Sequence, residues 1–168
     1  EAIRDYYLKC YAEAALDAKA QNDKCAIELL LELPSSKEPE YCHRLYRVDM
    51  YCTKNGEGLV REVNVPGKIV DRSNYNHICF EGPIAWYGID FRFKSDSALD
   101  AEIIQWALKW IDVNDDRYDE SKLFQEVIHS ITPVQSADSL AEFSVDFGSA
   151  PLSAFDEVIG ILTRSTPI

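Results

Sequence analysis

The chain has 168 residues and a formal net charge of −12, with 46% hydrophobic and 27% charged residues. This length predicts one domain over residues 1–168, and the composition is typical of a folded globular protein. Residues 96–168 carry 14 Asp and Glu against 4 Lys and Arg, so most of the excess negative charge lies in the C-terminal part. Such a field repels nucleic acid and anionic membranes and attracts cationic proteins.

The N-terminal half predicts a helix followed by strands. Apolar residues at helical spacing predict a helix over residues 2–20. Residues 26–33 fit either a helix or a strand, and the short length and the following proline favour a strand. Alternation over 46–52 predicts a half-buried strand, and Asn55-Gly56 predicts the tight turn of a hairpin whose second strand covers 59–65.

The C-terminal half predicts two strand–helix pairs. Residues 86–93 alternate like a strand, and an apolar stripe that starts at Leu99 predicts a helix lying across a sheet. Residues 143–147 predict the last strand and 152–162 the final helix, with Phe155, Ile159 and Leu162 on its buried face. Together these elements predict an α+β fold: a mainly antiparallel sheet with helices packed on one face.

The five cysteines are Cys10, Cys25, Cys42, Cys52 and Cys79. Their number is odd and no C-x-x-C pair occurs, which predicts reduced thiols in a cytoplasmic protein rather than a disulfide framework.

An acidic segment, residues 112–120, follows the helix that begins at Leu99. It starts like a calcium-binding EF-hand loop, but Arg117 stands where the turn needs glycine and Leu123 where a bidentate glutamate is needed. Anions at the C-terminal end of a helix oppose its dipole, and this cost suggests a use for the charge. We expect five residues of this segment to bind a partner: Asp112, Asp115, Asp116, Asp119 and Glu120.

Motifs for other chemistry are weak. His77 and Cys79 share a face if they lie in a strand, but no orienting carboxylate accompanies them. His43 and His129 have no metal-ligand spacing to one another or to a cysteine. Gly67-Lys68 lacks the remainder of a phosphate-binding loop. The sequence therefore predicts no catalytic residues, no metal ion and no cofactor.

The segment Val145-Asp146-Phe147-Gly148-Ser149-Ala150-Pro151, followed by an amphipathic helix, resembles the C-terminal strand–G-S-A-P–helix of small bacterial immunity proteins from polymorphic or contact-dependent toxin systems. The resemblance covers roughly 20 residues. It implies a protein that binds and blocks a cognate toxin, and it assigns no binding residue. The acidic charge points the same way, because a nuclease toxin is expected to be basic.

Three hypotheses follow from the sequence. The leading one is a non-enzymatic, acidic binding protein of the immunity type with a basic protein partner. The second is a small enzyme or ligand-binding domain with an apolar pocket around Trp86, Tyr87 and Trp106. The third is a structural subunit of an oligomer.

Overall fold

The chain begins with a helix and a three-stranded antiparallel sheet. In the computed structural model, which describes residues 1–34, 40–69, 83–94, 99–137 and 140–164, helix α1 covers Ala2–Gln21. The sheet has the order β1-β2-β3, with β1 at Lys24–Glu32, β2 at Leu45–Lys54 and β3 at Glu57–Arg61. The predicted hairpin turn is confirmed, because Asn55 and Gly56 adopt φ angles of 53° and 82° between β2 and β3.

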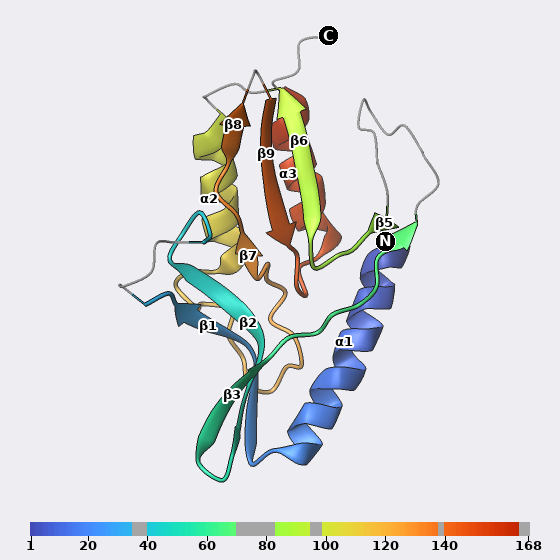
Figure 1. Ribbon diagram of the computed structural model, residues 1–168, viewed down its shortest axis with the longest axis vertical. Helices are drawn as coiled ribbons and strands as arrows, with labels where there is room; N and C mark the ends of the chain where they lie inside the picture. The colour runs from blue at the N-terminus through green and yellow to red at the C-terminus, as the bar shows by residue number, and fades with distance from the viewer. Residues whose placement is uncertain (35–39, 70–82, 95–98, 138–139, 165–168) are drawn as a thin grey trace.

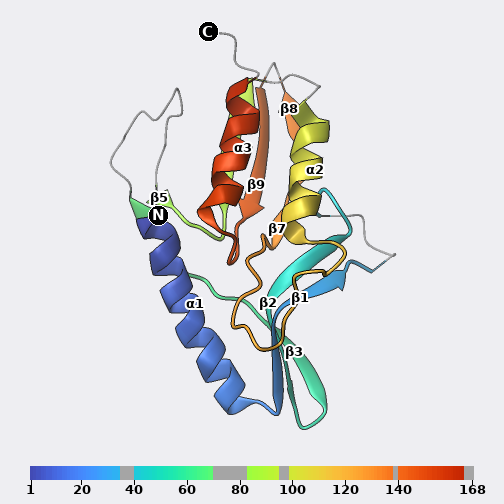
Figure 2. The ribbon, with the colours of Figure 1, turned by 180° about the vertical axis from the view of Figure 1, so that it is seen from behind.

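A second antiparallel sheet is built from the C-terminal half. Its central strand β9 (Leu140–Asp146) pairs with β6 (Ile89–Lys94), β7 (Ser130–Ile131) and β8 (Gln135–Ala137). Helices α2 (Leu99–Ile111) and α3 (Leu152–Arg164) lie side by side behind this sheet, on one face, as Figures 1 and 2 show. Two short strands, β4 (Lys68–Ile69) and β5 (Pro83–Ile84), form a separate pair. The α+β class is therefore confirmed, with the strands divided among three sheets.

Aromatic side chains fill the core where the helices meet the second sheet. The Trp86 and Phe147 ring centroids lie 4.8 Å apart, and the Trp106 ring meets Phe147 edge-on at 6.0 Å. The indole N–H groups of Trp86 and Trp106 donate to the carbonyl oxygens of Gly148 and Ala154. Both indoles are thus buried in the core with their N–H groups hydrogen-bonded.

The buried face of α3 differs from the prediction by one position. Ala154, Val158 and Ile161 are its buried residues, whereas the predicted Phe155, Ile159 and Leu162 are partly buried. The carbonyl oxygen of Ala154 accepts a hydrogen bond from the indole of Trp106 in α2, so this side of α3 faces the core.

The prediction that all cysteines are reduced is wrong for two of them. Cys25 of β1 pairs directly with Cys52 of β2 in the strand register, and a disulfide joins them. Cys10 and Cys42 are free thiols. The sequence could not show this pairing, because the register of β1 against β2 depends on the assembled sheet.

One predicted feature concerns residues that the structure does not describe. His77 and Cys79, which would share a face in a strand, lie outside the described residues.

No helix in the part of the chain that the structure describes has a stretch apolar enough and long enough to cross a bilayer.

Candidate functional site

Arg47 of β2 anchors the acidic segment after α2. Its guanidinium is buried and donates to the carbonyl oxygens of Glu28, Ile111 and Asp112. The same group contacts the Asp112 carboxylate at 3.4 Å and the Asp115 carboxylate at 2.8 Å. Arg47 therefore fastens the end of α2 and the start of the following segment to the first sheet through both backbone and side-chain oxygens.

The five predicted binding residues consequently have different environments. Asp112 is buried, its carboxylate also accepts a hydrogen bond from the Arg117 N–H, and the Asp115 side chain is 39% exposed. Asp116 and Glu120 are exposed. Asp119 is partly exposed, and its carboxylate accepts hydrogen bonds from the backbone and side chain of Ser121, which lower its pKa.

This arrangement corrects the reason given for a binding role of Asp112 and Asp115. Both carboxylates contact the single guanidinium of Arg47, which offsets part of their negative charge inside the molecule. This structural ion pair accounts for part of the electrostatic cost against the helix dipole without a binding partner.

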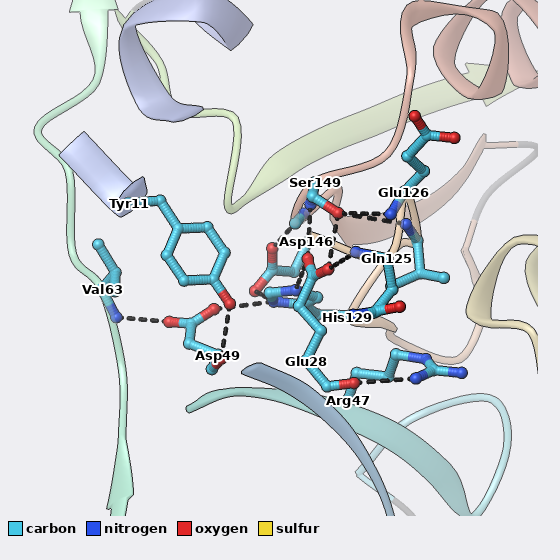
Figure 3. Close-up of polar contacts among 12 residues, drawn as sticks. Tyr11, Glu28, Arg47, Asp49, Val63, Gln125, Glu126, His129, Asp146 and Ser149 are labelled. Atoms are coloured by element: carbon cyan, nitrogen blue, oxygen red, sulfur yellow. Dashed lines mark hydrogen bonds and ion pairs between the residues drawn. The ribbon is translucent and has the colours of Figure 1, made fainter. Parts of the chain in front are cut away.

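A second polar cluster lies between the two main sheets, and sequence reasoning missed it. Its centre is His129, whose backbone joins the sheets: its N–H donates to the carbonyl of Asp146 at the end of β9, and its carbonyl accepts from the N–H of Arg47 in β2. The ring is 2% exposed. Three carboxylates surround it, from Glu28 in β1, Asp49 in β2 and Asp146 in β9 (Figure 3).

Glu28 is held by four hydrogen-bond donors. One carboxylate oxygen accepts from Nε2 of His129 at 2.9 Å and from the Ser149 N–H at 3.0 Å. The other accepts from the Ser149 hydroxyl at 2.8 Å and from the Gln125 N–H. Each of these four groups can donate, so both oxygens of this fully buried carboxyl group have their hydrogen-bonding capacity satisfied.

The backbone at Glu28 is strained to reach this position. Its φ of 56° lies in the left-handed region, which costs a non-glycine residue of order 1–3 kcal/mol. The flanking pairs Ile27↔Met50 and Leu29↔Val48 place Glu28 opposite Asp49. The Glu28 and Asp49 carboxylates contact the two different nitrogens of the His129 ring.

The Asp49 and Asp146 carboxylates each use one oxygen on a backbone amide and present the other to His129. Asp49 accepts from the Val63 N–H through Oδ2, and its Oδ1 lies 2.8 Å from Nδ1 of His129. Asp146 accepts from the Gly148 N–H through Oδ1, and its Oδ2 lies 3.6 Å from the same nitrogen. Nδ1 of His129 therefore faces two carboxylate oxygens whose orientation is fixed by the backbone.

The cluster changes the acidity of its members. Burial by itself lowers the pKa of His129, but the Asp146, Asp49 and Glu28 carboxylates outweigh burial and raise this pKa well above its usual value. Burial raises the pKa of Asp146, with a further increase from Asp49 and an opposing effect of His129. The surrounding carboxylates therefore favour the protonated, positively charged form of His129.

Tyr11 of α1 contacts the cluster, and Tyr7 of the same helix packs against Tyr11. The Tyr11 hydroxyl donates to the carbonyl oxygen of Asp49 at 2.6 Å. The Tyr7 hydroxyl is buried and has no hydrogen-bond partner among the described residues. Burial raises the pKa of Tyr7, and the Asp146, Asp49 and Glu28 carboxylates raise it further, which places this hydroxyl within the field of the cluster.

An open groove among the described residues lies apart from this cluster. It runs between α2 and α3, and ion pairs from Lys109 to Glu157 and from Arg164 to Glu102 link its two sides. The His129 cluster lies elsewhere, in the interior. Among the described residues, Asp49, His129 and Asp146 are the group whose donor atoms could hold a metal ion.

Comparison with protein-family models, curated proteins and solved structures finds no match to this chain. The residues of the chain itself are therefore the basis for assigning a function.

Three features of the sequence indicate that charged groups are buried in this cluster. Glu28 interrupts an apolar strand, Asp49 lies in the middle of another strand, and Gly148-Ser149 follows Asp146 after a single phenylalanine. A charged residue within a buried strand needs a partner. The sequence alone does not show that this partner is His129, which is 101 residues away from Glu28.

Proposed function

We propose that the chain is a non-enzymatic binding protein of the immunity type, which recognises a basic protein through the segment after α2. The observation that carries the proposal is the anchoring of this segment by Arg47, with Asp116 and Glu120 left exposed. A loop that is already ordered loses less conformational entropy on binding, so its charges act from fixed positions.

The division of labour among the five acidic residues refines the sequence prediction. Asp112 and Asp115 bind Arg47 and position the segment, whereas Asp116, Asp119 and Glu120 are the residues proposed to meet the partner. Exposed charges of this kind raise the rate of association more than the affinity. A blocked active site on a cationic toxin would be the functional result.

Two further observations bear on the proposal. The packed core around Trp86 and Trp106 supports a binding role over the apolar-pocket hypothesis. A cytoplasmic location is part of the proposal, and the Cys25–Cys52 disulfide is the observation against it, because disulfides persist mainly in oxidising compartments.

The test uses the protein encoded beside the gene for this chain as the probe. Association is measured by stopped-flow mixing at low and high salt for the wild type and the D116K/E120K variant. The control is E13K/D17K, which makes the same charge change at exposed positions of α1. We expect D116K/E120K to slow association at least ~10-fold at low salt, with a flatter salt dependence, and the control to have a smaller effect. Equal rates for the two variants, or no binding by the wild type, would contradict the proposal.

A further inference from the structure

The cluster around His129 has the arrangement of a metal site, independently of the acidic surface segment. Its three converging donor atoms are Nδ1 of His129, Oδ1 of Asp49 and Oδ2 of Asp146, and they lie within 4.8 Å of one another. Nδ1 is 2.8 Å from the Asp49 oxygen and 3.6 Å from the Asp146 oxygen. Ligands bound tetrahedrally to Zn²⁺ at about 2.1 Å are roughly 3.4 Å apart, so the spacing fits one ion with small shifts.

The surroundings orient each donor atom as metal sites do. A ligating histidine usually donates its second ring N–H to a carboxylate, which fixes the ring and leaves the other nitrogen for the metal. Nε2 of His129 makes this contact with Glu28. The amides of Val63 and Gly148 each bind one oxygen of the neighbouring aspartate and leave the second oxygen directed at Nδ1.

A proton on Nδ1 of His129 satisfies this geometry only in part. One N–H can donate to Asp49 at 2.8 Å, but Asp146 at 3.6 Å lies beyond hydrogen-bond distance. Three carboxyl groups surround the single imidazole, and the guanidinium of Arg47 contacts the Glu28 carbonyl rather than its carboxylate. A divalent cation between the three donor atoms would serve both aspartates and balance their charge.

An independent observation comes from Tyr7. This buried hydroxyl has no partner among the described residues and lies within the field of the same carboxylates. A polar group that is buried without a partner is costly, so this hydroxyl is available to water or another group near the cluster. The Asp146 side chain is 26% exposed and the Asp49 and His129 side chains 8% and 2%, so Asp146 is the most accessible of the three.

From this geometry we propose that Asp49, His129 and Asp146 bind one divalent transition-metal ion, with Glu28 as the outer partner of the histidine. One imidazole nitrogen and two carboxylate oxygens form a ligand set that suits Zn²⁺ or Mn²⁺. The histidine argues against Ca²⁺ and Mg²⁺, which prefer oxygen ligands throughout. The ion would join β2 and β9 at the junction of the two sheets, and its role would be structural.

The experiment measures Zn²⁺ binding to the chelator-treated, full chain by calorimetry, with Co²⁺ as a spectroscopic probe of the ligands. We expect one Zn²⁺ per chain, a rise in melting temperature on binding, and Co²⁺ absorption bands typical of nitrogen and oxygen ligands. D146N removes the partly exposed ligand and should weaken Zn²⁺ affinity more than about 100-fold, beyond the usual effect of an outer-shell change. H129Q should abolish binding.

Two matched controls keep the result specific. D90N changes an exposed aspartate in the neighbouring strand, and H43Q removes another described histidine outside the cluster. Both should bind Zn²⁺ like the wild type. Because H129Q could fail to fold, D146N with a native circular dichroism spectrum is the deciding variant. The proposal is overturned if the wild type binds neither Zn²⁺, Mn²⁺ nor Co²⁺, or if D146N binds as tightly as D90N.

Discussion

Glu28 and His129 are in contact at 2.9 Å although 101 residues separate them, and this contact ties β1 to the junction of the two sheets. Glu28 also binds Ser149 at the start of the turn before α3. A single buried carboxylate thus connects the first strand of one sheet to the segment that leads into the last helix (Figure 3).

Glu28→Ala should strongly destabilise the protein. The change leaves four donors without an acceptor, and breaking a buried charged contact costs about 3–5 kcal/mol. Urea denaturation followed by circular dichroism measures the free energy of unfolding. The control is Glu32→Ala, at the exposed end of the same strand, which should cost less than about 1 kcal/mol. Equal stability of the two variants would show that the cluster does not support the fold.

Arg47→Ala should release the acidic segment. It leaves Asp112 buried without its cation, so we expect a loss of about 3–5 kcal/mol and faster proteolysis within residues 112–120. Arg47→Lys should not restore stability, because an ammonium group cannot reach the same set of oxygens as the guanidinium. Arg92→Ala removes an exposed ion pair with Glu142 and serves as the control. Unchanged proteolysis in Arg47→Ala would contradict the anchoring role.

Gly148→Ala should be destabilising, whereas Gly160→Ala should not. Gly148 has a φ of +46°, and a Cβ atom there would lie 2.2 Å from the His129 ring, so we expect a loss of about 2–4 kcal/mol. Gly160 lies within α3 with nothing within 4 Å of an added Cβ atom, and alanine there should add about 0.5–1 kcal/mol of stability. Thermal and urea denaturation of the two variants measures these two changes in stability.

Reduction of the Cys25–Cys52 disulfide should lower stability. The bond closes a loop over a sequence separation of 27, for which the chain-entropy relation gives roughly 3–4 kcal/mol. A C25A/C52A variant should melt earlier than the oxidised wild type and should match the reduced wild type closely. Thiol titration of the unfolded, unreduced protein should find the thiol groups of Cys25 and Cys52 unavailable. Their full availability would restore the original prediction of reduced cysteines.

Cys42 should react slowly with alkylating reagents in the folded state. Burial raises the pKa of its thiol from 9.0 to about 11, so the reactive thiolate is about 100-fold scarcer at pH 8. Because the pKa of the Cys42 thiol is higher in the folded protein than in the unfolded chain, the reactivity of the folded protein should increase with pH up to about 11. Mass spectrometry of iodoacetamide-treated protein measures the rate at Cys42, with the urea-unfolded chain as the control. Equal rates in the two states would contradict this burial.

The sequence by itself determined the elements whose signals are local. The helical spacing of α1, the Asn55-Gly56 turn and the apolar stripe of α2 depend on neighbouring residues, and each was predicted correctly. The α+β class followed from them. The face of α3 was one position off, because the contact of Ala154 with Trp106 depends on another helix.

Only the tertiary structure decided the polar interior. From the sequence, Asp112 and Asp115 are interpreted as surface charges, whereas the fold places Arg47 beside them. From the sequence, His129 has no recognisable partner, whereas in the fold β1, β2 and β9 bring three carboxylates to its ring. The physical reason is that a buried charge is defined by its partner, and strand pairing brings partners together across about a hundred residues, a distance at which no local pattern can reveal the contact.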